Sequence, residues 1–298
     1  MKKHFYLTIT AILFFQFTYG QNYSTEFQQA LQQADTTAQL NILTKWKEAA
    51  PQDPELFTSF FNYYFLKSKE NGIGITKGQP KGESFVITDS LDQVQGYIGN
   101  QVYYDQKDLQ NALEIIEQGI ALYPDRLDMR FGKIYVLGQV KDWDKFTSEI
   151  IRTIEYSSTN NNKWTWTNNE LQQNGEDFFL SSLQDYQVQL YNTGKDALLM
   201  NMRSIAREIL KYYPNNIESL SNLSITYLLT GEYDKGLEPL LKAEKITPTD
   251  YIVLSNIAQG YRLKGDKEKA VEYYEKTAKY GDDRAKEFAK IQIEELKK

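Results

Sequence analysis

The sequence between Ile217 and Asp282 repeats itself with a period of 34 residues, and this period constrains the fold more than any other feature of the chain. A repeat of this length predicts a stack of similar supersecondary units, each burying its apolar face against its neighbours. The matching pairs, 34 positions apart, are Leu220 and Leu254, Ser221 and Ser255, Asn222 and Asn256, Leu223 and Ile257, Tyr227 and Tyr261, Gly231 and Gly265, and Glu238 and Glu272.

Each copy also places its apolar and small residues in a fixed order. The first segment has a bulky residue, then Leu or Ile, then a small residue and Tyr, while the second has a small residue four positions before a large apolar one. This pattern resembles the tetratricopeptide repeat. The resemblance implies an all-α, tetratricopeptide-like α-solenoid of helix-turn-helix repeats, and a non-catalytic interaction scaffold that binds a protein or an extended peptide in its concave groove. The residues in register are Leu220, Leu223, Ser224, Tyr227, Gly236, Leu240 and Pro248 in one copy, and Leu254, Ile257, Ala258, Tyr261, Ala270 and Tyr274 in the next.

Proline residues mark more divergent repeats upstream. Pro214 lies 34 residues before Pro248, and Pro124 follows apolar residues at matching offsets. The most polar stretch, around residues 156–175, has the composition of a linker, and its Trp164 and Trp166 are expected to cover an exposed core edge or to anchor a partner. The expected organisation is a signal peptide at 1–20, divergent helical repeats at 21–157 with an insertion at 71–88, a polar linker at 158–175, and regular repeats with a capping helix at 176–298.

The insertion interrupts the helical pattern. Two short β-favouring runs, residues 71–76 and 83–88, flank a turn that is rich in glycine and contains Pro80. This arrangement predicts a small β-hairpin or an ordered loop. Directly after it, Ser90 followed by Gln93 has the spacing of a capping box, which predicts a helix that ends near Tyr104.

The first twenty residues have the features of a secretory signal. Lys2 and Lys3 precede an apolar run from Phe5 to Tyr19, and the small Gly20 closes it. The run is too short for a membrane anchor, and no cysteine follows that could carry a lipid. We therefore expect cleavage after Gly20 and a periplasmic or secreted protein.

Composition excludes several classes of function. The chain has no cysteine, and its one histidine, His4, lies within the expected signal segment. Cysteine nucleophiles, serine–histidine–aspartate sites and most zinc or copper sites are thereby excluded. No phosphate-binding loop or cofactor motif is present, so we expect no catalytic residue, metal or cofactor. A net charge of −6 without a basic cluster also argues against nucleic acid as a partner.

The resemblance implies which residues face the groove. Asn222 and Asn256 would form a ladder of carboxamides, each able to donate to and accept from one peptide unit of an extended ligand. Arg262 is placed to meet a carboxylate. The other residues that the resemblance places on this face are Ser221, Ile225 and Leu229 in one repeat, and Ser255 and Gln259 in the next, with Glu218, Ile252 and Leu263 beside them.

Alternatives remain at this point. The asparagines are also explained if that residue is simply usual at this place in the repeat. A second hypothesis for the function is a glycan-binding or small-ligand-binding protein that uses the aromatic residues, 14% of the chain, together with the insertion. Catalysis by carboxylates is a third hypothesis, which the absence of facing acid pairs disfavours.

Overall fold

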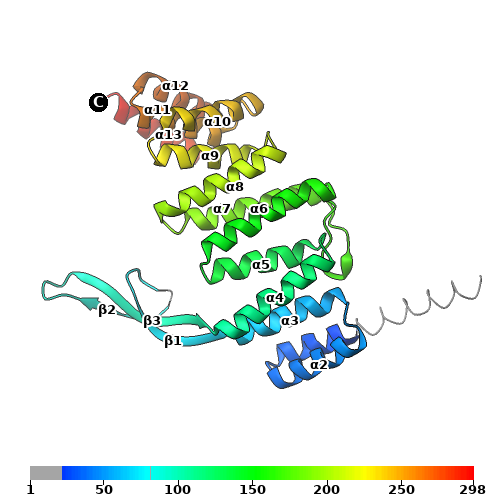
Figure 1. The fold of residues 1–298 in the computed structure, drawn as a ribbon. Helices are drawn as coiled ribbons and strands as arrows, with labels where there is room; N and C mark the ends of the chain where they lie inside the picture. The colour runs from blue at the N-terminus through cyan, green and yellow to red at the C-terminus, as the bar shows by residue number, and fades with distance from the viewer. Residues whose placement is uncertain (1–21, 81) are drawn as a thin grey trace, which may run out of the picture. The chain divides into compact units, whose positions relative to one another are not determined.

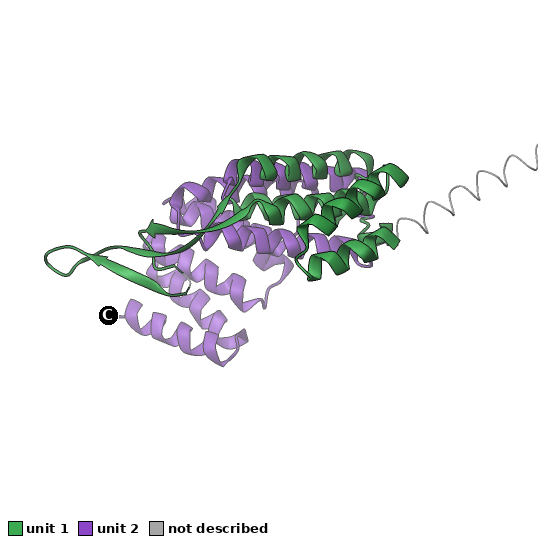
Figure 2. Cartoon of the chain, turned by 90° about the horizontal axis from the view of Figure 1, so that it is seen from below, with its two compact units in different colours: residues 1–140, 164–172 green, residues 141–163, 173–298 purple. Residues whose placement is uncertain are grey.

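The computed structural model describes residues 22–80 and 82–298, so the expected signal segment lies outside the described residues. The described part is dominated by α-helices, with one three-stranded β-sheet near its N-terminal end (Figure 1). The chain divides into two compact units, which Figure 2 shows in different colours. Unit 1 comprises residues 1–140 and 164–172, and unit 2 comprises residues 141–163 and 173–298.

Unit 1 is built from antiparallel helices with an aromatic core. A helix over residues 22–32 precedes α2 (Thr36–Ala49), α3 (Pro54–Lys67), α4 (Gln106–Leu122) and α5 (Leu127–Gln139). The Asp53 side chain accepts a hydrogen bond from the backbone N–H of Glu55 and caps α3, whose first residue is Pro54. Trp46 is fully buried among the first three helices, and Phe61 and Phe65 of α3 pack against α4 and α5.

Residues 164–172 are part of unit 1. Trp164 is fully buried, and the ring of Trp166 meets that of Phe131 edge-on. The backbone of Thr165 donates to Asp125 and accepts from Leu127, which joins this segment to the start of α5. It also contains a short 3-10 helix, η1 (Thr167–Asn169). Trp164 is therefore a core residue and not an anchor for a partner.

The inserted element is a three-stranded antiparallel sheet of β1 (Lys69–Thr76), β2 (Ser84–Thr88) and β3 (Val94–Tyr104), in the order β1-β3-β2. We call it the β-arm; Figure 1 shows it extending away from α3 and α4. The prediction of a small β element inserted into helices is confirmed. The prediction of a helix ending near Tyr104 is wrong.

The helix was predicted from one capping signature, and stronger β signals override it. Residues 94–104 include Gly96 and Gly99, which weaken a helix, and six β-branched or tyrosine residues that favour a strand. The turn before β3 is made by Asp89, whose carboxylate accepts from the backbone N–H groups of Leu91 and Gln93. Ser90 therefore lies within a hairpin turn and caps no helix.

Unit 2 contains the regular repeats. Asn216 and Asp250 cap the first helices of the two clear copies, and Gly231 and Gly265 adopt positive φ angles of 78° and 89° in the turns that follow. The shared core includes Leu240, Leu254 and Tyr274. The helices are α6 (Trp143–Asn160), α7 (Gly175–Tyr191), α8 (Leu199–Tyr212), α9 (Ile217–Leu229), α10 (Tyr233–Ile246), α11 (Tyr251–Lys264), α12 (Lys267–Tyr280) and α13 (Asp283–Leu296), with a 3-10 turn, η2 (Asp196–Leu198), before α8.

Candidate functional site

The predicted groove residues lie on α9 and α11, the first helices of the two regular repeats. These two helices are in contact, and residues 34 apart occupy equivalent places on them. We call the side of α9 and α11 that carries these residues the first-helix face. Its members on α9 are Ser221, Asn222, Ile225 and Leu229, and its members on α11 are Ile252, Ser255, Asn256, Gln259, Arg262 and Leu263.

The two asparagines differ in their surroundings. Asn222 is only 6% exposed, and its Nδ2 donates to Oε1 of Gln184 at 2.5 Å. Asn256 is half-buried, and its side chain makes no hydrogen bond within residues 22–80 and 82–298. One N–H donor of the Asn222 carboxamide is therefore used by Gln184 of unit 2. Both N–H donors and the carbonyl acceptor of the Asn256 carboxamide remain available to a ligand.

Sequence reasoning missed Gln184, and the period explains why. Gln184 lies on α7, 38 residues before Asn222, whereas the 34-residue register points to Val188. The connection between α7 and α8, which contains η2, shifts the register there. The contact between Gln184 and Asn222 therefore depends on the length of the loop between α7 and α8, and no sequence motif indicates that length.

Gln259 and Arg262 form the most polar part of the face. Oε1 of Gln259 accepts two hydrogen bonds, from Nε of Arg262 at 3.0 Å and from the hydroxyl of Tyr274 at 2.9 Å. Burial raises the pKa of Tyr274, so its hydroxyl stays neutral and keeps donating. This orientation leaves Nε2 of Gln259 with no partner in the described chain, next to the exposed Arg262.

Apolar side chains flank these polar groups. Leu229 is 54% exposed and Ile252 is 57% exposed, and Leu263 also reaches solvent. Ile225 and the two serines are half-buried. The face thus combines exposed aliphatic side chains with amide and guanidinium donors, a composition suited to a peptide segment.

Comparison with known proteins identifies the helical pair that carries most of this face. The family model for the tetratricopeptide repeat matches residues 253–286, a stretch that runs from α11 to the start of α13. The chain contains a tetratricopeptide repeat. Asn256, Gln259 and Arg262 all lie within the matched repeat, on its first helix. A comparison with curated proteins gave no match.

Solved tetratricopeptide-repeat structures resemble the chain at low identity. YrrB, described as having an unusual peptide-binding site, is 14% identical, with coverage of 83% of this chain and 97% of YrrB and a TM-score of 0.42. MamA is 13% identical, with coverage of 61% and 93% and a TM-score of 0.38. TTC0263 from Thermus thermophilus is 15% identical, with coverage of 62% and 90% and a TM-score of 0.38.

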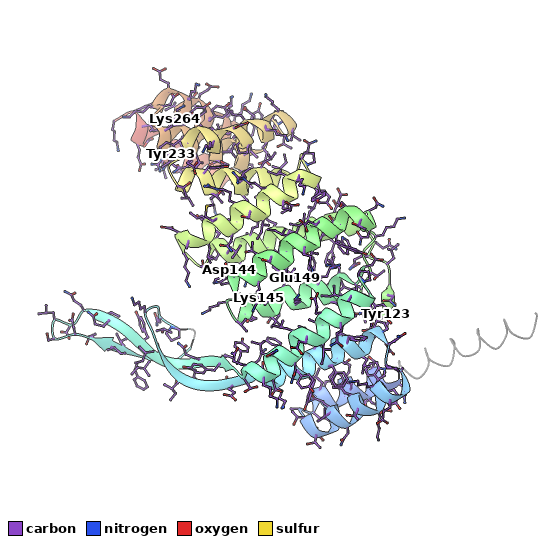
Figure 3. All side chains as sticks on the ribbon, viewed as in Figure 1. Tyr123, Asp144, Lys145, Glu149, Tyr233 and Lys264 are labelled. Atoms are coloured by element: carbon purple, nitrogen blue, oxygen red, sulfur yellow. The ribbon has the colours of Figure 1, made fainter. Side chains whose placement is uncertain are left out.

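A separate hollow of about 900 Å³ lies along α10, the second helix of the preceding repeat. None of the predicted groove residues lines it. Lys264, labelled in Figure 3, pairs there with Asp234, and Lys242 donates to the carbonyl of Pro214 at 2.5 Å. Its lysines are thus partly occupied by groups of the chain itself.

The described residues contain neither a cluster of metal ligands nor a membrane-spanning helix. Among them no three His, Cys, Asp or Glu side chains gather as metal ligands would. Over the same residues, every helix is too short or too polar to span a bilayer. The acidic pair Asp282 and Asp283 has a structural use, because Asp282 caps α13 by accepting from the backbone N–H of Ala285.

Proposed function

We propose that the first-helix face of unit 2 binds an extended peptide segment of a partner protein, and that the chain acts as a non-catalytic interaction scaffold. One observation carries this proposal. Asn256, Nε2 of Gln259 and the two terminal nitrogens of Arg262 are all available on one helix face, between the exposed Ile252 and Leu263. Tetratricopeptide-repeat proteins are generally non-catalytic protein-interaction scaffolds, which also supports this proposal.

Each available group has a defined partner in a peptide. The carboxamide of Asn256 can donate to a backbone carbonyl and accept from a backbone N–H of the same ligand. Nε2 of Gln259 can donate to a neighbouring carbonyl. Arg262 adds a positive charge, and its exposed guanidinium favours a carboxylate, from an acidic side chain or from a C-terminus. The aliphatic side chains then fit apolar residues of the ligand.

Asn222 has a different role in this proposal. Because it is buried and bound to Gln184, it holds α7 and α9 together and orients the face instead of contacting the ligand directly. The polar ladder is therefore unequal: the step on α9 is structural and the step on α11 faces the ligand. Replacing Asn222 should lower thermal stability, whereas replacing Asn256 should not.

The test begins with selection of peptides from a random library displayed on phage, using the full chain as bait. Binding of a selected peptide is then measured by titration calorimetry. Asn256→Ala should weaken binding by about 0.5–1.5 kcal/mol, or roughly two- to tenfold, and Arg262→Ala by about 1.5–3 kcal/mol if the peptide carries a carboxylate. Lys45→Ala, at an exposed site on α2, is the matched control and should leave the affinity unchanged.

Two outcomes would contradict the proposal. The first is that selected peptides bind equally well to the wild type and to a chain with both Asn256→Ala and Arg262→Ala. The second is that no peptide is selected while the chain binds a glycan array, which would favour the alternative function. Melting curves of every variant separate loss of binding from loss of folding.

We also propose that the chain is exported, with residues 1–20 removed. The support is the sequence alone: two lysines, an apolar run and a closing small residue. Intact-mass measurement of the protein from its native host should give a chain that begins at Gln21. A mass that corresponds to a chain with residues 1–20 still attached would contradict the proposed export and cleavage.

A further inference from the structure

The two outer strands of the β-arm differ in how well their free edges are protected. β2 has five residues, and its pairing with β3 is disturbed by an irregularity between Ile87 and Thr88. β1 has eight residues, all paired with β3 in one continuous register. Its last six residues, Asn71–Thr76, carry no charge, no proline and no bulge. Short length, irregularity and charge are the usual protection of edge strands. Asn71–Thr76 lacks all three, because the charged residues of β1, Lys69 and Glu70, lie at the start of the strand.

The two faces of the β-arm also differ. On one face the ring of Tyr103 lies over Gly72 and Gly74, close enough that a Cβ on Gly72 would approach the ring at 2.8 Å. On the opposite face, Ile73 and Ile75 of β1 are 75% and 72% exposed, and Phe85 of β2 is 79% exposed. On the first face Tyr103 thus covers Gly72 and Gly74, whereas the second face carries an open row of apolar residues.

The outer edge of β1 requires a partner of a particular kind. Within residues 22–80 and 82–298, β1 pairs with no strand except β3, so its outer edge is open to a further strand. The backbone carbonyl of Ile73 has one side-chain donor, the hydroxyl of Tyr103, at the long distance of 3.5 Å. A strand that pairs with this edge must be extended and uncharged. It should also carry alternate apolar residues, to continue the row formed by Ile73 and Ile75.

We propose that two copies of the chain pair through β1, in antiparallel orientation about a two-fold axis at Gly74. The segment Asn71–Thr76 itself has the chemistry that the edge requires. In this register Ile73 of each copy lies opposite Ile75 of the other, and Gly72 lies opposite Thr76. Like charges do not meet within the paired segment, although the whole chain carries a net charge of −6.

The pairing converts two three-stranded sheets into one of six strands, a common size for a sheet. Edge pairing supplies backbone hydrogen bonds but buries less surface than the roughly 1,200 Å² or more of a stable interface. The association is therefore reversible, and we expect a dissociation constant in the micromolar range. It is independent of peptide binding to the first-helix face.

Sedimentation velocity of the full chain, at concentrations from about 1 to 100 μM, tests the proposal. The sedimentation coefficient should rise from that of a monomer toward that of a dimer. A monomer at all of these concentrations would overturn it. Assembly beyond a dimer would also overturn it, because a two-fold contact closes after two copies.

Variants at exposed positions then locate the contact. Ile73→Lys and Ile75→Glu each place a charge on the β1 row and should raise the dissociation constant at least about tenfold. Phe85→Lys is the matched control, on the same face but in β2, and should leave self-association unchanged. If Phe85→Lys also abolishes self-association, the copies meet through the apolar face and the edge pairing is wrong.

A mixing experiment separates pairing from misfolding. In the proposed register, a mixture of the Ile73→Lys and Ile75→Glu chains places the new ammonium opposite the new carboxylate. The mixture should therefore associate at concentrations at which each variant alone stays monomeric. If the two variants fold, as judged by circular dichroism, but remain monomeric when mixed, the antiparallel register is refuted.

Discussion

The helices of unit 2 and those of unit 1 pack against one another through different kinds of side chains. In α9–α12 of unit 2, helices in register pack through small and apolar residues, such as Gly236 against Leu228 and the fully buried Leu240 and Ala258. In α3–α5 of unit 1, the 34-residue register is weak, and packing uses aromatic residues and a clamp of charged groups.

Arg126 is the centre of the clamp. It is 1% exposed, and its guanidinium donates to Asp128 at 2.7 Å and 2.8 Å, to Glu55 at 2.7 Å and to Asn169 at 3.3 Å. Burial opposes its charge, but the hydrogen bonds that Arg126 donates to the carboxylates of Asp128 and Glu55 outweigh burial and raise the pKa of Arg126. The clamp thereby ties η1 to α3 and to the start of α5.

The difference shows that the core of a helical repeat can be completed by residues of the same repeat or by a segment distant in the sequence. In the regular repeats, the two helices of one 34-residue unit pack against each other. A short sequence motif therefore predicts their packing. In unit 1, residues 164–172 come from beyond α6 and complete the packing of α3 and α5. The following substitutions test this contrast, in decreasing order of expected effect.

Trp164→Ala should have the largest effect. The indole is fully buried, so its removal leaves a large cavity and should lower the free energy of unfolding by about 3–5 kcal/mol. Urea denaturation followed by circular dichroism measures the loss. Trp166→Ala, at a half-buried position, should cost less. A cost of Trp164→Ala below about 1 kcal/mol would contradict the placement of Trp164 in the core of unit 1.

Arg126→Met breaks the clamp. It leaves Glu55 and Asp128 without their cation and should cost about 3 kcal/mol of the free energy of unfolding. Adding Glu55→Gln removes one uncompensated carboxylate and should recover part of that loss, which distinguishes the charge from the shape of the site. A single substitution that melts like the wild type would mean that aromatic packing alone closes unit 1.

Gly236→Ala examines the regular repeats. A Cβ at this place would lie 2.7 Å from Cδ2 of Leu228 and 3.2 Å from the carbonyl of Ser224, so the expected overpacking costs about 1–3 kcal/mol, against a gain of up to about 1 kcal/mol in helix propensity. Gly132→Ala in α5 is the matched control, because its nearest contact is 3.2 Å away on Phe61. Thermal melts should show a loss for Gly236 and little change for Gly132.

Lys264→Ala should have the smallest effect. Its partner Asp234 is 82% exposed, and a surface ion pair of this kind contributes about 0–1 kcal/mol. The melting temperature should change little, and added salt should remove any difference. A loss comparable to that of Arg126→Met would contradict the view that unit 2 is held by apolar packing.

The sequence alone determined the repeats and their first helices. The 34-residue spacing placed α9 and α11 correctly, because each match reflects a contact made within one repeat or with the next. It also indicated the β-arm through glycine, proline and β-branched residues. These are local signals, and local signals can be read along the chain.

Only the tertiary structure decided the rest. It showed that residues 94–104 form a strand because β1 and β2 pair on either side of it, which a capping signature cannot reveal. It also showed that Trp164 enters the core of unit 1, and that Asn222 is occupied by Gln184 while Asn256 is not. Apart from the local hairpin of β2 and β3, these features depend on residues far apart in the sequence. The loop lengths that bring such residues together carry no motif.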